Sequence, residues 1–190
     1  MSIKALGMLG AGLSLSVIAF FQWFLVSIGR KKAGNNRTVS FMDLIITSDD
    51  ESYSLSRLQM YLWTVAVIVG YVAVFFATPG IPVIPESLYI LMGVNFASSV
   101  ASTAINTKVA SSPAAPTPPN FLNDIFFESP GSLDLPRTQM FIWTIVSLGV
   151  FIVTLVNSFD NGPKLPDITN GLAVLMGISN GAYLGAKAAK

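Results

Sequence analysis

Two octapeptides hold the polar side chains of this sequence that are best placed to bind another group. RLQMYLWT at 57–64 and RTQMFIWT at 137–144 share Arg, Gln, Met, Trp and Thr at the same spacing. A guanidinium binds phosphate or carboxylate, and a Gln amide both donates and accepts hydrogen bonds. In a helix the Gln and the Trp share one face, because they are four residues apart. The chemistry that this pattern offers is recognition rather than catalysis.

The octapeptides predict two roles. We expect Arg57 and Arg137 to act as interfacial anchors, with their guanidinium groups among lipid head groups. The Gln and Trp side chains are expected to pack against neighbouring helices, and Ser54 and Asp134 are expected to be helix N-caps. The alternative is that Arg and Gln line a polar contact with a partner or the mouth of a pore. The predicted packing residues are Gln59, Trp63, Gln139 and Trp143.

A second pattern places a small residue at every fourth position in two other apolar segments. This spacing lets helix backbones approach closely in lipid, where close packing drives association, either within one chain or between chains. Ser and Asn side chains flank the small residues, and they offer a third interpretation, a polar lining of a pore. The small residues are Gly93, Ala97, Ala101, Gly177, Gly181 and Gly185. The flanking residues are Asn95, Ser98, Ser99 and Ser102, with Ser179 and Asn180 beside the second segment.

The sequence lacks the residues on which most catalytic and metal sites depend. It contains no Cys and no His, which removes thiol chemistry, the commonest general base and the commonest metal ligand. The Gly-rich run GMLGAG at 7–12 lies inside an apolar segment, so it does not predict a nucleotide loop. The net charge of +1 gives no steering toward nucleic acid. We therefore expect no enzyme, no cofactor, no metal site and no nucleic-acid partner.

Hydropathy and charge patterning indicate the elements that position these residues. Of the 190 residues, 52% are hydrophobic and only 11% are charged, whereas a soluble domain has about 25% charged residues. The charges bound five uncharged runs, at 5–29, 58–85, 87–107, 138–159 and 168–186. A helix needs roughly 20 apolar residues to cross a bilayer. The sequence thus predicts an all-α integral membrane protein with five transmembrane helices.

The octapeptides belong to a longer internal duplication. Each copy contains a short segment of bulky apolar residues with a carboxylate, then the octapeptide, a Pro-x-x-Pro turn followed by Glu or Asp, and an LMG tripeptide. Because both copies start on the same side, we expect parallel repeats, each a helical hairpin preceded by a short interfacial helix. The predicted domains are an N-terminal transmembrane anchor at 1–30, a first repeat at 31–107, a Pro- and Ala-rich linker at 108–120 and a second repeat at 121–190.

The repeat resembles a hairpin that recurs in small bacterial membrane proteins of uncharacterised role. The resemblance rests on SLSRLQMxxWT, then Pro-x-x-Pro followed by Glu or Asp, then LMGxxxxxxYLGxK. It covers about residues 41–190, and the second copy matches the ending better, since the first has Ser99 where the second has Tyr183. The resemblance implies a membrane hairpin and no activity.

The loops predict an orientation, because Lys and Arg are enriched on the cytoplasmic side of a membrane. With the N-terminus outside and the C-terminus in the cytoplasm, nine of the eleven basic residues are cytoplasmic. We expect a homo-oligomer embedded in the lipid bilayer of a bacterial inner membrane. Its expected function is that of a non-enzymatic scaffold or anchor for a cytoplasmic or membrane partner. The alternative is an oligomeric pore or channel.

Overall fold

The computed structural model describes residues 2–33, 53–109, 120–127 and 132–189. Six α-helices make up most of this part of the chain, which contains no strand. The prediction of an all-α chain is therefore confirmed for the described residues. The helices are α1 (Ile3–Ala33), α3 (Leu55–Ala77), α4 (Glu86–Val109), α5 (Phe121–Phe126), α6 (Leu135–Ser158) and α7 (Asn170–Ala188).

Among the described residues, four helices are long and apolar enough to cross a membrane: α1, α3, α4 and α6. These helices indicate an integral membrane protein. The fifth predicted span corresponds to α7, which is not one of the four. Its 19 residues include Ser179, Asn180 and Lys187, and such polar side chains lower the hydropathy of a segment.

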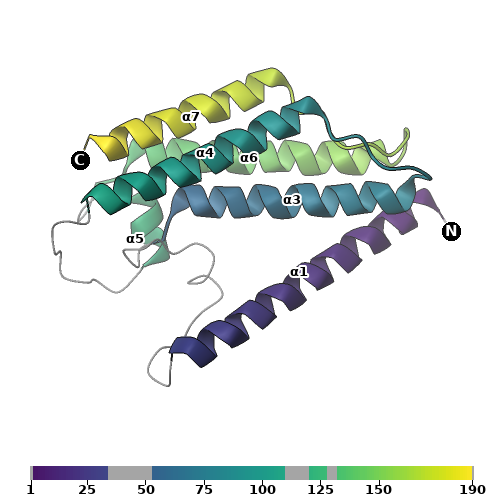
Figure 1. The fold of residues 1–190 in the computed structure, drawn as a ribbon. Helices are drawn as coiled ribbons and strands as arrows, with labels where there is room; N and C mark the ends of the chain where they lie inside the picture. The colour runs from purple at the N-terminus through teal and green to yellow at the C-terminus, as the bar shows by residue number, and fades with distance from the viewer. Residues whose placement is uncertain (1, 34–52, 110–119, 128–131, 190) are drawn as a thin grey trace.

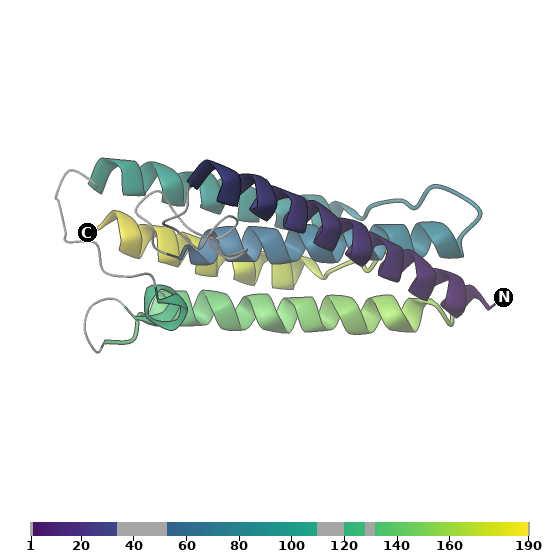
Figure 2. The same ribbon diagram turned by 90° about the horizontal axis from the view of Figure 1, so that it is seen from below.

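Helices α3, α4, α7 and α6 form a four-helix bundle in which each helix contacts the two beside it (Figures 1 and 2). Helices α3 and α6 begin at the end of the bundle where α5 lies, and α4 and α7 return to it. We name this end the α5 end. The opposite end, with residues 78–85 and 159–169, is named the turn end. The described charged side chains therefore gather at the two ends and leave the middle of the bundle uncharged.

Helix α1 packs against α3 outside the bundle and runs antiparallel to it (Figure 1). Its N-terminus is held at the turn end, where Lys4 forms an ion pair with Asp160. The crossing depends on glycine, because a Cβ atom at Gly10 would lie 2.9 Å from the backbone oxygen of Val72. The GMLGAG run thus contributes to the surface at which α1 crosses α3. Much of the rest of α1 exposes large apolar side chains.

The two turns at the turn end are joined by one side chain. Ser87 Oγ donates a hydrogen bond to Asp167 Oδ1 at 2.7 Å and accepts one from the backbone N–H of Ile168 at 3.1 Å. Ser87 follows the Pro-x-x-Pro turn at 82–85, and Asp167 follows the one at 163–166. The contact therefore links the hairpin α3–α4 to the hairpin α6–α7 at corresponding points.

Helix α5 closes the other end of the bundle. The Asn120 side chain caps it by accepting a hydrogen bond from the backbone N–H of Asn123 at 3.3 Å. Ile125 is fully buried against the bundle. Helix α4 continues to Val109, inside the predicted linker, and the rest of that linker up to 119 lies outside the described residues, as do residues 34–52 of the first predicted interfacial segment.

Candidate functional site

Two apolar clusters fill the interior of the bundle, one toward each end. The turn-end cluster is built around Trp63 and Phe151, whose rings meet edge to face with their centroids 5.9 Å apart. Its other buried members are Val67, Val74, Leu88, Leu91, Leu155, Leu165, Ile168 and Met176. The α5-end cluster consists of Leu55, Ile125, Met140 and Tyr183.

Polar side chains occupy the interior between these clusters on all four helices of the bundle. On α7, for example, Ser179 and Asn180 lie between Met176 of the turn-end cluster and Tyr183 of the α5-end cluster. We name this set the polar layer and define it by its buried members. They are Gln59 on α3, Asn95, Ser98, Ser99 and Ser102 on α4, Thr144 and Ser147 on α6, and Ser179 and Asn180 on α7.

The polar layer reaches the middle of two apolar spans. Asn95 is the tenth residue of the 20-residue span Glu86–Ile105, and Ser147 is the thirteenth of the 24-residue span Leu135–Ser158. At 1.5 Å per residue, both lie roughly 14–18 Å from either end of their span. The hydrocarbon core of a bilayer is about 30 Å thick. In a membrane, these two side chains therefore lie close to its centre.

Several atoms of the polar layer have no hydrogen-bond partner among the described residues. Asn95 and Asn180 are each 1% exposed, and neither the oxygen nor the nitrogen of either amide is paired. The hydroxyl groups of Ser147 and Ser179 and the Oε1 atom of Gln59 are likewise unpaired. A buried polar group without a partner costs about 1–3 kcal/mol. The bundle therefore keeps a costly set of donors and acceptors in its centre, which marks this set as the candidate functional site.

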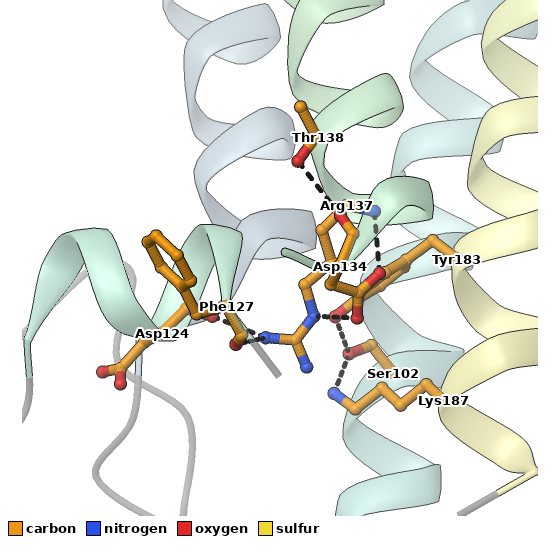
Figure 3. A network of polar contacts seen from close by, with 8 residues as sticks. All are labelled: Ser102, Asp124, Phe127, Asp134, Arg137, Thr138, Tyr183 and Lys187. Atoms are coloured by element: carbon orange, nitrogen blue, oxygen red, sulfur yellow. Dashed lines mark hydrogen bonds and ion pairs between the residues drawn. The ribbon is translucent and has the colours of Figure 1, made fainter. Parts of the chain in front are cut away.

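The α5 end of the polar layer, by contrast, is hydrogen-bonded. Ser102 Oγ lies 3.4 Å from the Tyr183 hydroxyl and accepts a hydrogen bond from Lys187 Nζ at 2.6 Å (Figure 3). The Lys187 ammonium also lies 5.7 Å from the centre of the Tyr183 ring, within the range of a cation–π contact. Because Lys187 is only half-buried, these three residues connect the polar layer with the edge of the bundle.

Arg137 ties α5 to the start of α6 at the same end (Figure 3). Its Nη1 donates a hydrogen bond to the backbone oxygen of Asp124 at 2.7 Å, and its Nε lies 3.0 Å from Asp134 Oδ2 as an ion pair. The Nε–H is not aimed at a hydrogen-bond acceptor, so the contact is held by charge. The Asp124 carboxylate in turn accepts a hydrogen bond from the backbone N–H of Tyr53 at 3.0 Å. The predicted anchor Arg137 thus binds protein groups, and Arg57 is half-buried at the start of α3.

The caps of the two octapeptide helices also differ. Asp134 accepts a hydrogen bond from the backbone N–H of Arg137 at 3.2 Å, so it is the predicted N-cap of α6. Ser54 occupies the N-cap position of α3 but makes no side-chain capping bond. Its hydroxyl lies 3.1 Å from that of Ser56 instead. The predicted position of this cap is right and its predicted bond is wrong.

The two octapeptides do not bury the same helix face. Gln59 and Trp63 are buried, as predicted, whereas Gln139 is exposed and the next residue, Met140, is buried instead. A shift of one residue turns the buried face by about 100°. Gln139 therefore does not pack within the described part of the chain, and its assembly role stays a prediction. Trp143 is only partly buried against the turn-end cluster. The cause is the neighbours, because α3 contacts α1, α4 and α6, whereas α6 contacts α3, α5 and α7.

The predicted small-residue stripes do not pack inside the described part of the chain. Gly93, Ala97, Gly181 and Gly185 are exposed, and Ala101 and Gly177 are half-buried. A Cβ atom placed on any of the four glycines would meet nothing within 4 Å. Close packing within one chain, which was one of the two packing interpretations, does not occur at these glycines. Packing between chains stays a prediction.

The residues predicted as a polar lining face the interior of the bundle. Asn95, Ser98, Ser99 and Ser102 are all at most 7% exposed. A pore formed between copies of the chain would need these side chains on the outside of the bundle. Their placement therefore disfavours a lining shared between subunits.

Helix α6 contributes two members of the polar layer that the sequence analysis did not assign to a site, Thr144 and Ser147. They recur on the buried face with Met140, Phe151 and Leu155 at intervals of three or four residues. This periodicity is the sequence signal that places Thr144 and Ser147 on the buried face of α6. It is weak because the exposed faces of α6 are as apolar as the buried one, and the Thr144 hydroxyl is satisfied by the Met140 carbonyl at 2.8 Å.

Comparisons with known proteins add no family to this description. No family model, curated protein or solved structure matches the chain. The resemblance to bacterial membrane hairpins accordingly stays a prediction. The structure shows an all-helical chain with four helices suited to span a membrane and a buried polar layer at the centre of its bundle.

Proposed function

We propose that the chain is a non-enzymatic membrane scaffold that associates with copies of itself through the outer faces of α4 and α7. The observation that carries this proposal is the outward position of the small residues, since the space beside Gly93, Gly181 and Gly185 is open. In lipid, such residues let a second helix approach closely, and van der Waals packing then drives association. The exposed part of each stripe also carries no charge, so it can face a neighbour inside the hydrocarbon layer.

The chemistry of the polar layer supports a role without catalysis. Its members are amides and hydroxyls, with no carboxylate and no basic group among them. A hydroxyl becomes a useful nucleophile only when an adjacent base removes its proton. The charged side chains nearest to the layer, such as Lys187 and Arg137, are already engaged in hydrogen bonds with protein groups.

The α5 end is the proposed surface for a cytoplasmic or membrane partner. Arg57, Arg137 and Lys187 lie at this end of the bundle, and the enrichment of basic residues on the cytoplasmic side supports a cytoplasmic position for it. Three large apolar side chains beside them are exposed: Leu122, Leu133 and Leu135. Apolar and basic side chains together suit the inner head-group region or a partner bound there.

We also propose that the two hairpins are parallel repeats and that α7 is a fifth span. The hairpins α3–α4 and α6–α7 run in the same order, and α7 lies beside α4 and α6 over its length (Figure 1). The Ser87–Asp167 contact joins their corresponding turns. In α7 the polar residues Ser179 and Asn180 are buried inside the bundle, which allows a helix of lower hydropathy to cross with its apolar side toward lipid.

Substitution in the outer stripe tests the scaffold proposal. In Gly181→Leu, a large side chain on the outer face of α7 is expected to separate neighbouring chains and to reduce the mass of the detergent-extracted particle to that of a single chain. Gly149→Leu is the matched control, because Gly149 on α6 is also exposed with nothing within 4 Å of its Cβ position but belongs to no stripe. If Gly181→Leu leaves the mass unchanged, as Gly149→Leu is expected to do, this face is not the assembly surface.

A further inference from the structure

The unpaired atoms of the polar layer share a chemistry that restricts what can bind there. Each amide of Asn95 and Asn180 offers two N–H donors and one acceptor oxygen, and each hydroxyl of Ser147 and Ser179 can donate and accept. The set is uncharged, and no group of three or more His, Cys, Asp or Glu that could hold a metal ion lies among the described residues. A neutral partner that donates and accepts hydrogen bonds at once satisfies all of these atoms without bringing a charge into the bundle.

The positions of these atoms restrict the size of the partner. The atoms of these four side chains come from α4, α6 and α7, the unpaired Oε1 atom of Gln59 comes from α3, and all lie in the interval between the two apolar clusters. Their side chains are 0–2% exposed, so a partner for these atoms is enclosed within the bundle. Water is the smallest molecule that satisfies donors and acceptors together, and a buried water commonly makes about three hydrogen bonds to groups that are otherwise unpaired.

We propose that the polar layer is an internal water-binding site, in which ordered water molecules bridge Asn95, Asn180, Ser147 and Ser179 near the centre of the membrane. Water bound in this way supplies the hydrogen bonds that the amides lack within the protein. The site lies inside one chain, so it is independent of the outer faces through which copies of the chain are proposed to associate.

Water reaches this site from the α5 end. On that side Ser102, Tyr183 and Lys187 form a continuous polar contact from the layer to the edge of the bundle (Figure 3). On the other side the turn-end cluster places eight buried apolar side chains around Trp63 and Phe151. A polar route has a low cost for water, whereas a dry apolar cluster blocks it.

Magnetisation transfer from water to the side-chain amides tests the binding site. The full chain is labelled with nitrogen-15 at Asn and Leu in lipid nanodiscs, and Asn95→Leu and Asn180→Leu assign the two amide signals. Both amides are expected to receive magnetisation from water, as the exposed Asn157 does, while the backbone N–H of Leu91 in the turn-end cluster receives none. Absence of transfer to both buried amides overturns the proposal, and so does a direct contact between the two amides without water.

The route is tested by deuterium exchange of the same amides in variants of each cluster. Tyr183→Ala opens the α5-end cluster and is expected to speed exchange about tenfold, because exchange follows the free energy of local opening. Phe151→Ala is the matched change in the turn-end cluster and is expected to speed it less. If Tyr183→Ala does not insert into nanodiscs, Lys187→Ala at the outer end of the same network replaces it. Faster exchange in Phe151→Ala than in the α5-end variant overturns the route.

Discussion

Gln59 is 2% exposed inside the bundle, whereas Gln139, the same residue of the second octapeptide, lies on an exposed face. The two helices that carry these residues are therefore turned differently within the bundle, although their octapeptides share Arg, Gln, Met, Trp and Thr at the same spacing. The neighbours of each helix decide which face is buried, so the two octapeptides lie in different surroundings. The two octapeptides consequently differ in which of their side chains are buried.

This difference predicts unequal effects of one substitution at the two sites. Gln59→Ala removes a buried side chain between the two apolar clusters and is expected to lower the free energy of unfolding by about 1–2 kcal/mol. Gln139→Ala changes an exposed position and is expected to alter it by less than about 0.5 kcal/mol. Thermal unfolding of both variants in detergent, followed by circular dichroism, measures the difference. Equal losses of stability in the two variants would contradict the finding that α3 buries Gln59 whereas α6 exposes Gln139.

The Trp residues of the octapeptides form a second matched pair. Trp63 is fully buried against Phe151, so Trp63→Ala is expected to cost about 3–5 kcal/mol through the cavity that it leaves. Trp143 is only partly buried, and Trp143→Ala is expected to cost clearly less. Chemical denaturation followed by the fluorescence of the remaining Trp residues compares the two. A larger loss of stability for Trp143→Ala would show that Trp143, and not Trp63, contributes more to the packing of the core.

The crossing of α1 and α3 predicts that Gly10 cannot be enlarged. A Cβ at this position already meets the backbone oxygen of Val72 at 2.9 Å, so Gly10→Val is expected to destabilise the packing of α1 by about 1–3 kcal/mol. Gly12→Val is the control, because nothing lies within 4 Å of its Cβ position. Limited proteolysis of α1 measures how far its packing against α3 is lost in each variant. Equal protection of the two variants would mean that α1 does not cross α3 at Gly10.

The contact at the turn end predicts a role for Ser87 in joining the hairpins. Ser87→Ala removes the hydrogen bond to Asp167 and leaves the buried N–H of Ile168 without its acceptor, so it is expected to cost about 1–3 kcal/mol. Asp167→Asn keeps an acceptor oxygen for Ser87 and should cost less. Thermal unfolding of both variants checks this order. A larger loss for Asp167→Asn than for Ser87→Ala would show that the charge of Asp167 contributes more to stability than the hydrogen bonds of the Ser87 hydroxyl.

Much of the helical layout could be predicted from the sequence, because charge placement and capping residues are local signals. Asp134 caps α6 as predicted, and α3 begins directly after the predicted N-cap Ser54. The orientation of each helix could not be predicted in the same way. Helices α3 and α6 are apolar on all sides, so hydropathy does not distinguish the face toward lipid from the face toward protein.

The small residues and the polar residues of α7 lie on different faces of the helix for a related reason. The stripe through Gly181 was expected to be a packing or assembly face, and it lies outside the bundle, whereas the flanking Asn180 is buried. In lipid, burying a polar group lowers the free energy more than burying a glycine, so the polar face turns inward. Glycine does make a close helix crossing at Gly10, in the GMLGAG run of α1.

A membrane scaffold that associates with copies of itself is expected to leave its membrane as an assembly of several chains. Native mass spectrometry of the wild-type chain, released from its own membrane in a mild detergent, tests this most directly. The scaffold account predicts particles that contain more than one copy of the chain, with the copies held together until the detergent is made harsher. Particles that contain a single chain at every protein concentration would contradict it.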